Sequence, residues 1–302
     1  MNCITRRDFT RGTVLAGTMA LGRGQAAAPP KGPTLCLFSK HLPQMNYAEL
    51  ARTVRQLGFG GVDLTVRPEG HVLPERAAED LPRAVATLRA AGLEVPMITT
   101  SLTAPSDPAA RPTLAAAGGL GVPFFKLGYW PYRGQDSIEA RIGEVRRDVA
   151  GLVALGKEHG VAAGFHNHSG LHVGAAVWDT RAIIGDMDQR WIGYYFDPCH
   201  ATAEGGLGGW QIALRMALAR IKMVAIKDFS WEKHAGKWTM QMCPLGQGMV
   251  DWPTFFSVLA GSGFSGPISL HVEYEPSEMI GAITRDFAFL RKQVDQAFGG
   301  LS

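Results

Sequence analysis

Short apolar runs that alternate with helix-like stretches constrain the fold of this chain more than any other feature. Eight runs occur, and most are continuously apolar, which is typical of strands buried on both faces of a parallel sheet. They fall at 35–39, 61–66, 95–99, 124–129, 161–168, 191–200, 221–228 and 266–275. Eight β/α units in about 270 residues predict a (β/α)8 TIM barrel rather than an open doubly wound sheet.

The stretches between these runs carry helical periodicity and helix-start signals. Helices are predicted near 47–57, 79–91, 108–118, 137–159, 175–185, 209–219, 252–261 and 280–297, with Asn46 as the cap of the first. The longest irregular stretches, 67–74 and 230–248, follow strand ends and should lie over the barrel mouth. The second contains Trp, Met, Lys and Gly, which favours a substrate-covering loop.

The first 28 residues have the order of a twin-arginine export signal. Arg6 and Arg7 precede a weakly apolar run at 12–22, and small residues at 26–28 offer a cleavage site. A basic, disordered tail is the alternative interpretation. The prediction is a signal peptide at 1–28 and a single barrel domain at 29–302. The protein would then use the twin-arginine translocon, act in the periplasm and carry no stable membrane anchor.

Charge and cysteine content exclude several classes of protein. Residues 1–28 hold four arginines and one aspartate, a net charge of +3, and the whole chain is also +3. The remainder is therefore near neutral, which gives no support for a nucleic-acid partner. One of the four cysteines, Cys3, lies in the predicted signal, so at most one internal disulfide is left and a disulfide scaffold is excluded.

Polar side chains stand at the ends of the last four apolar runs. They are the cluster His166-Asn167-His168, then Asp197 with His200, then Lys227-Asp228, and finally Glu273. Parallel barrels place their active sites at the C-terminal ends of their strands. These distant residues are therefore predicted to form one site, and the protein is predicted to be an enzyme.

The residue types suggest what this site does. Asp197 and Glu273 can hold a divalent cation or divide acid and base roles; a helix cap and a salt-bridged rim residue are the alternatives. His166 and His168 are two apart on a strand and point the same way, so one can ligate a metal while the other moves a proton. Lys227 can polarise a carbonyl or form an ion pair with Asp228 or a metal-site carboxylate.

Four further residues are predicted to contact substrate. Asn167, His200 and Asp228 adjoin the groups just described, and His71 follows the second strand. A loop-stabilising contact is the alternative for His200. The glycine-rich segment 205–209 precedes a helix, so a phosphate site must be weighed, but a flexible loop is favoured because no nucleotide-binding signature accompanies it.

Several of these segments resemble the sugar phosphate isomerase/epimerase family, the xylose-isomerase-like barrels. The most specific are FHNHSG (165–170), YFDPCHATAEGG (195–206), IKDFSW (226–231), CPLGQGMVDW (243–252) and GPISLHVEYE (266–275). They are similar to an exported subgroup with an HNH motif at strand five. The resemblance implies a divalent metal (Mn²⁺, Mg²⁺, Co²⁺ or Zn²⁺) held by Glu, Asp, His and Glu at strands five to eight.

The chain departs from that ligand pattern at two positions. Asp197 and Glu273 match family ligands, but His166 stands in place of the first glutamate and Ala225 in place of the histidine. The resemblance then implies a metal held by His166, Asp197 and Glu273, with water or His168 completing the set, or no metal at all.

The activity implied is proton abstraction next to a sugar carbonyl, with Glu273 and a histidine of the HNH group such as His168 as the bases and Lys227 or the metal stabilising the enediolate oxygen. This would make the protein a carbohydrate isomerase or epimerase. A lyase that cleaves 3-keto-glycosides by elimination and a non-catalytic periplasmic sugar-binding barrel are the alternatives. A homo-oligomer is compatible with the sequence.

Overall fold

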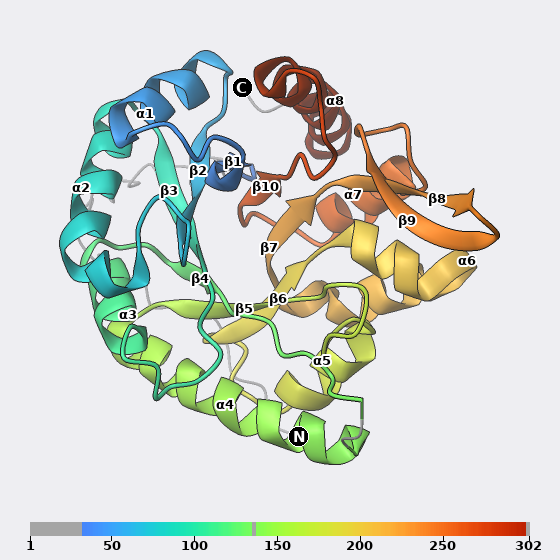
Figure 1. The fold of residues 1–302 in the computed structure, drawn as a ribbon, viewed down its shortest axis with the longest axis horizontal. Helices are drawn as coiled ribbons and strands as arrows, with labels where there is room; N and C mark the ends of the chain where they lie inside the picture. The colour runs from blue at the N-terminus through green and yellow to red at the C-terminus, as the bar shows by residue number, and fades with distance from the viewer. Residues whose placement is uncertain (1–31, 135–136, 300–302) are drawn as a thin grey trace, which may run out of the picture. The chain divides into compact units, whose positions relative to one another are not determined.

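Eight parallel strands close into a barrel in the computed structural model, which describes residues 32–134 and 137–299 (Figure 1). The strands neighbour one another in the order β1-β10-β7-β6-β5-β4-β3-β2. Their bounds are β1 (Leu35–Phe38), β2 (Gly61–Val66), β3 (Glu94–Thr100), β4 (Phe124–Lys126), β5 (Ala162–His166), β6 (Ile192–Phe196), β7 (Ile221–Ile226) and β10 (Ile268–Leu270). The predicted TIM barrel is confirmed. The predicted export signal lies outside the described residues.

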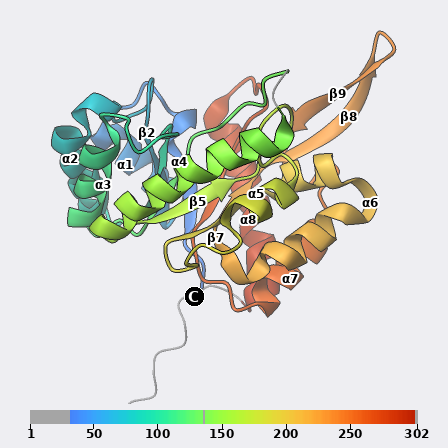
Figure 2. The same ribbon diagram turned by 90° about the horizontal axis from the view of Figure 1, so that it is seen from below.

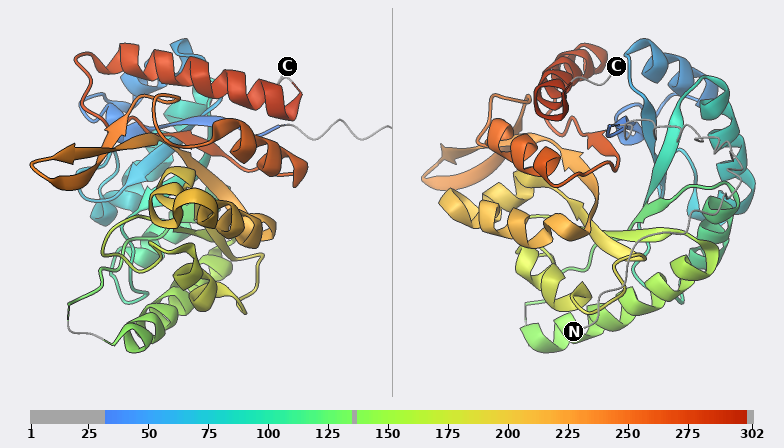
Figure 3. Two further views of the ribbon diagram at one scale, coloured as in Figure 1. Left: turned by 90° about the vertical axis from the view of Figure 1, so that its right-hand side faces the viewer. Right: turned by 180° about the vertical axis from the view of Figure 1, so that it is seen from behind.

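Helices follow the barrel strands and surround them, as the view from behind also shows (Figure 3). The α-helices are α1 (Tyr47–Gln56), α2 (Ala77–Ala90), α3 (Ala110–Gly119), α4 (Ile138–His159), α5 (Val177–Ile184), α6 (Pro198–Ala217), α7 (Trp252–Gly261) and α8 (Met279–Phe298). Short 3-10 turns are η1 (Ser39–His41), η2 (Pro74–Arg76) and η3 (Leu218–Arg220). No helix in the described ranges is both long enough and apolar enough to cross a membrane.

Local signals explain several helix boundaries. Asn46 caps α1 by accepting from the N–H groups of Ala48 and Glu49, and the Glu49 carboxylate closes a capping box on the Asn46 N–H. Ser137 caps α4, which ends at Gly160 with φ 75°, a conformation that glycine adopts without strain. These boundaries agree with the periodicity of the sequence.

Helix α6 differs from its prediction. It begins at Pro198, directly after β6, instead of near residue 209. The glycine-rich segment 205–209 is part of this helix rather than a loop, and the helical path is broken at Gly206, where φ is 55° and ψ is −142°. The prediction of a flexible loop was therefore wrong. The proline after Asp197 favours a helix start at that position.

The stretch 230–248 is also more regular than predicted. Strands β8 (Asp228–His234) and β9 (Lys237–Cys243) form an antiparallel hairpin that projects away from the helices (Figure 2). Its turn has positive φ at Ala235 and Gly236, as a two-residue hairpin turn requires. Trp231 pairs with Met240 in the ladder. A structured arm therefore replaces the expected irregular loop.

Apolar side chains fill the barrel and the layer between strands and helices. Inside the barrel, Met97, Tyr195, Met223 and Ala225 form a small cluster of their own. Ala225, at the position of the missing family histidine, is fully buried in this cluster. A larger side chain there would have to displace packed neighbours.

Candidate functional site

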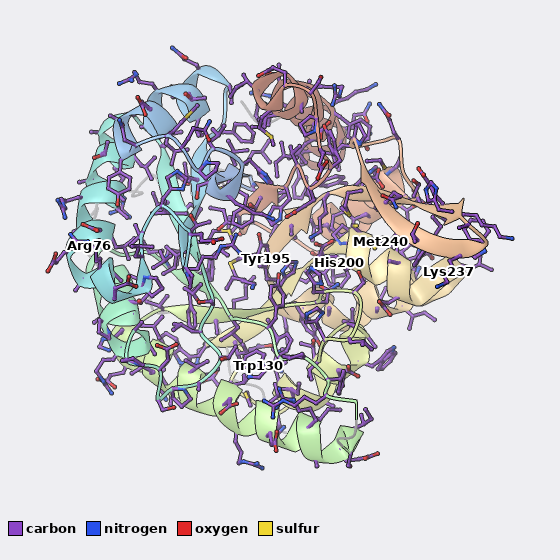
Figure 4. The ribbon with its side chains drawn as sticks, viewed as in Figure 1. Arg76, Trp130, Tyr195, His200, Lys237 and Met240 are labelled. Atoms are coloured by element: carbon purple, nitrogen blue, oxygen red, sulfur yellow. The ribbon has the colours of Figure 1, made fainter. Side chains whose placement is uncertain are left out.

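A cavity of about 620 Å³ opens where the barrel strands end. This volume is in the range of about 300–1,000 Å³ that is common for small-molecule sites. Figure 4 places Tyr195 and His200 near the centre of the barrel, whereas Arg76 and Lys237 lie at its periphery. The lining comprises Phe38, Lys40, Arg67, Thr99, Lys126, Tyr129, His166, His168, Ser169, Gly170, Tyr195, His200, Ala203, Glu204, Lys227, Trp231, Met240, Met242, His271 and Glu273.

Asp197 is the buried anchor beneath the cavity. Its Oδ2 lies 3.1 Å from Lys227 Nζ and 3.1 Å from His166 Nε2. Its Oδ1 accepts from the His200 backbone N–H at 3.1 Å, which caps α6. The carboxylate is therefore both a helix cap and the partner of Lys227. Lys227 forms its ion pair with Asp197 rather than with the adjacent Asp228.

This ion pair keeps both groups charged. Burial alone would raise the pKa of Asp197, but the Lys227 ammonium, together with His200 and His271, outweighs burial and lowers that pKa. Burial would likewise lower the pKa of Lys227, whereas the carboxylates of Asp197 and Glu273 raise it above its ordinary value. A fixed positive charge therefore faces the cavity.

His166 has both ring nitrogens occupied. Nε2 faces Asp197, and Nδ1 lies 2.7 Å from the Tyr129 hydroxyl. Burial, and then the Lys227 charge, lower the pKa of His166 well below the ordinary value, so the ring is neutral. In the neutral ring, Nε2–H donates to the carboxylate and Nδ1 accepts from Tyr129.

His168 and His200 both line the cavity, with ring centroids 4.0 Å apart and the ring planes inclined by 39°. His168 Nδ1 donates to the Ser169 carbonyl at 2.9 Å, which leaves the Nε2 lone pair available in the neutral ring. Burial, followed by the Lys227 charge, lowers the pKa of His168 to about 4. His200 Nδ1 lies 2.6 Å from Ser169 Oγ.

Asn167 lies between the two histidines of the motif but does not line the cavity. Its amide nitrogen donates to the Asp197 carbonyl at 2.9 Å, and its amide oxygen accepts the Asp197 N–H at 2.9 Å. The side chain is fully buried. The structure contradicts the prediction of a substrate contact, because Asn167 joins the ends of β5 and β6 instead.

The Asp228 carboxylate also makes its hydrogen bonds within the protein. It accepts from the backbone N–H groups of Phe229, Gly246, Gly248 and Val250 and from Trp252 Nε1. It is buried and holds the chain after the hairpin against the end of β7. The predicted substrate contact of Asp228 is contradicted for this reason.

His71 does not line the cavity. Its Nδ1 lies 3.3 Å from Thr65 Oγ1, and its backbone N–H donates to the same hydroxyl at 2.9 Å. The predicted role in substrate binding is not supported, because the ring lies against Thr65 of β2 and outside the lining of the cavity.

Glu273 follows β10, the last barrel strand in the sequence, and also lines the cavity. Its Oε2 accepts from Lys40 Nζ at 2.8 Å, and its Oε1 lies 3.6 Å from His271 Nδ1. Burial would raise the pKa of Glu273, but His271, Lys227 and Lys40 lower it strongly. The group is an ionised carboxylate and a weak base.

A network of hydrogen bonds inside the barrel links Asp63 to His271, the neighbour of Glu273 in the cavity lining. Asp63 accepts from Thr99, Tyr195 and Ser269 hydroxyls at 2.7, 3.0 and 2.9 Å. The Tyr195 oxygen also lies 3.0 Å from His271 Nε2. Because the tyrosine proton goes to the carboxylate, His271 Nε2–H must donate to the tyrosine oxygen.

Several lining residues were not predicted from the sequence. Lys126 ends the fourth strand and Tyr129 follows it; Lys40 follows the first strand and Arg67 the second. The strand-end rule applied to these runs would have found them. His271 is two residues before Glu273, so the same-face spacing that drew attention to His166 and His168 applied there as well.

Buried neutral histidines predict acid sensitivity of the fold. His41 Nε2 accepts the Val272 N–H at 3.0 Å, and burial lowers the pKa of His41 to about 3. Unfolded histidine has a pKa of about 6.5, so between that pH and about 4 the unfolded state binds more protons than the folded state. The contribution of His41 and His168 to stability is complete above pH 6.5 and is lost as the pH falls.

We expect the free energy of unfolding to fall between pH 7 and pH 5, with a slope of up to about 1.4 kcal/mol per pH unit for each histidine. Urea titrations at several pH values measure this slope. Equal stability at pH 7 and pH 5 would contradict the neutral state of these rings.

Comparison with known proteins identifies the family. Residues 51–293 match the model of the xylose isomerase-like TIM barrel family. The chain belongs to this family. The sequence resemblance to xylose-isomerase-like barrels is thereby confirmed, whereas the exported subgroup with an HNH motif stays a prediction.

Individual proteins of known name are similar to this chain in fold or in part of the sequence. A xylose isomerase domain protein from Planctomyces limnophilus has a TM-score of 0.69 at 18% identity, covering 89% of this chain and 100% of that one. The 3-keto-D-glucoside 4-epimerase of E. coli has a TM-score of 0.69 at 15% identity, covering 86% and 99%. An inosose dehydratase from Erwinia tasmaniensis is 27% identical over 138 residues, which are 42% of this chain and 46% of that protein.

The donor set does not fit the divalent metal that the family resemblance implies. The Lys227 ammonium lies on Asp197 Oδ2, His166 uses both nitrogens, and Lys40 holds Glu273. Within residues 32–134 and 137–299, no group of three or more His, Cys, Asp or Glu side chains is arranged to hold a metal ion. The proton transfer proposed below therefore uses protein side chains alone.

Proposed function

We propose that the protein is a carbohydrate isomerase or epimerase-type enzyme that removes the proton next to a sugar carbonyl. One observation carries the proposal: the buried Lys227 ammonium, fixed by Asp197, lines the same cavity as the neutral ring of His168. An electrophile and a base in one enclosed site are what this reaction needs. The epimerases among the solved structures of this fold agree with the proposal.

The steps follow from the charges in the cavity. Lys227 donates a hydrogen bond to the carbonyl oxygen and stabilises the negative charge that develops on it when the adjacent C–H bond breaks. His168 accepts the proton at Nε2 and becomes the imidazolium. Return of that proton to the former carbonyl carbon, with transfer of the adjacent hydroxyl proton to the former carbonyl oxygen, completes an isomerisation. An epimerisation instead needs a second group, on the opposite face of the enediolate, that protonates the original carbon.

Glu273 has a different role in this scheme from the base expected from sequence. Because Lys40 and His271 hold its carboxylate in the ionised state, it is a strong hydrogen-bond acceptor and a poor base. We assign to it the binding of a substrate hydroxyl. His200 lies against His168 in the lining of the cavity, and we keep for it the predicted role of a substrate hydrogen bond.

A 3-keto-glycoside lyase is the second candidate. Its first step is the same proton removal, after which the electron pair expels the group on the β-carbon. The match to an inosose dehydratase favours it, because dehydration is also a β-elimination. Export to the periplasm through the twin-arginine route stays a prediction, since residues 1–28 lie outside the described part of the chain.

Proton exchange tests the proposal directly. The purified protein, treated with EDTA, is incubated in D₂O with ketoses and with 3-keto-glucosides, and deuterium at the carbon next to the carbonyl is followed by NMR. We expect exchange with at least one substrate, at a rate that the chelator does not change. Release of the aglycone would identify the lyase.

Two outcomes would contradict the scheme. Sugar binding in calorimetry without exchange would identify a sugar-binding barrel instead of an enzyme. Exchange that disappears with EDTA and returns with Mn²⁺ or Zn²⁺ would show that Lys227 is not the electrophile.

A further inference from the structure

Most charges that line the cavity have partners. Lys227 pairs with Asp197, and Lys40 pairs with Glu273. Glu204, at the rim, accepts the Gly170 N–H at 2.9 Å. Asp63, inside the barrel, accepts from three hydroxyls; its charge raises the pKa of Lys126 but does not outweigh burial, and no ion pair joins the two. These pairings leave two cations, Lys126 and Arg67, over.

Lys126 is the more unusual of the two. It is the last residue of β4 and lines the cavity, only 3% of its surface is exposed, and its Nζ lies 3.4 Å from the centroid of the Tyr129 ring. No carboxylate of the described residues lies within ion-pair distance of it. Burial, and then the charge of Arg67, lower the pKa of Lys126 well below its ordinary value. A buried amine in this state gains from a nearby negative charge.

Arg67 supplies a second cation to the same lining. It follows β2, and its guanidinium carbon lies 5.6 Å from the centroid of the Phe38 ring. No ion pair joins it to any carboxylate in the described ranges. Both side chains line the same cavity, and the charge of Arg67 contributes to the lowered pKa of Lys126. An anion bound beside both cations would be attracted by each of them.

We propose that Lys126 and Arg67 form a subsite for an anionic group, a carboxylate or a phosphate, carried by the sugar substrate. The guanidinium can bind two oxygens of such a group, and the ammonium supplies a point charge from a site with little water. The proposal rests on the proposed function, because it assigns a substrate class to the same cavity.

The position of the subsite also orients the substrate. Lys126 and Arg67 belong to the arc of the barrel from β2 to β4, whereas Lys227 follows β7 and His168 follows β5. The anionic group would therefore bind on the β2–β4 side of the cavity and the carbonyl on the side of β7. An acidic sugar, with its charge several carbons from the reacting carbon, fits this arrangement.

Calorimetry with three matched sugars tests the subsite: D-glucose, D-glucuronate and D-glucose 6-phosphate. We expect at least one acidic sugar to bind at least tenfold more tightly than glucose, and the difference to shrink as salt increases. Comparison of the two acids distinguishes a carboxylate from a phosphate site. Lys126→Met and Arg67→Met should each remove most of the preference.

Lys157→Met and Arg52→Met, at exposed positions on α4 and α1, are the matched controls and should keep the preference. Thermal melting shows whether each variant folds. If Lys126→Met does not fold, Arg67→Met alone tests the subsite. Equal binding of neutral and acidic sugars overturns the subsite. If neutral ketoses still exchange protons in that case, the proposed function stands; absence of exchange with every sugar would overturn it separately.

Discussion

Replacement of Lys227 by methionine should lower turnover by about 100- to 1,000-fold, the loss typical of removing one donor to a developing oxyanion. It should also destabilise the fold, because Asp197 would be left buried without its ammonium partner. Breaking a buried ion pair in this way costs about 3–5 kcal/mol. Deuterium exchange and urea unfolding measure the two effects.

The double variant Lys227→Met/Asp197→Asn separates them. The neutral amide removes the unpaired charge, so much of the lost stability should return, whereas turnover should stay low because the electrophile is still missing. Turnover within tenfold of the wild type in the stable double variant would exclude Lys227 from the chemistry.

Replacement of His168 by alanine should lower turnover by about 100- to 10,000-fold, the range for loss of a general base. The pH profile supplies the specific signature. The neutral ring is the active form and the pKa of His168 is about 4, so kcat/KM should be flat above that pH and fall tenfold per unit below it. The variant should lose this acid limb.

His172 provides the matched control. Its ring centroid lies 5.1 Å from that of His168, but it does not line the cavity. His172→Ala should keep both the rate and the acid limb. A His168→Ala variant with a wild-type profile would show that another group removes the proton.

The barrel could be predicted because its signal is local and repeated. Each strand is a short apolar run, and each run is followed by a polar residue that marks its end, as at Asp197 and Lys227. Eight repetitions make the closed parallel sheet the simplest arrangement. The hairpin was missed because its strands mix Trp, Glu, Lys and Met without a continuous apolar run.

The site was predicted only in part, and alternation explains the errors. Neighbouring residues on an extended chain point to opposite sides. Lys227 faces the cavity, so Asp228 faces the loop behind it; His166 and His168 face the cavity, so Asn167 faces the β6 backbone. Treating each polar cluster as one unit hid this distinction.

The partners of the charged groups could not be read from sequence at all. Lys40 and Glu273 are 233 residues apart and meet only because β1 and β10 are neighbours in the closed barrel. Whether Lys126 lacks a carboxylate is likewise a property of the fold. These pairings decide which cations are available to a ligand.

The attachment of the hairpin to the barrel keeps the hairpin residues that line the cavity apart from the residues proposed to move protons. The carboxylate of Asp228, next to Lys227, accepts hydrogen bonds from both ends of the hairpin: from Phe229 at the start of β8, and from Gly246 and Gly248 after β9. Beyond these hydrogen bonds, the strands contribute Trp231, Met240 and Met242 to the cavity, while Trp238 is 64% exposed farther out. We expect hairpins of other lengths and sequences to be accepted on the same anchor. Exchange of this one arm would then be a route by which the barrel acquires new substrates while its proton-transfer residues stay in place.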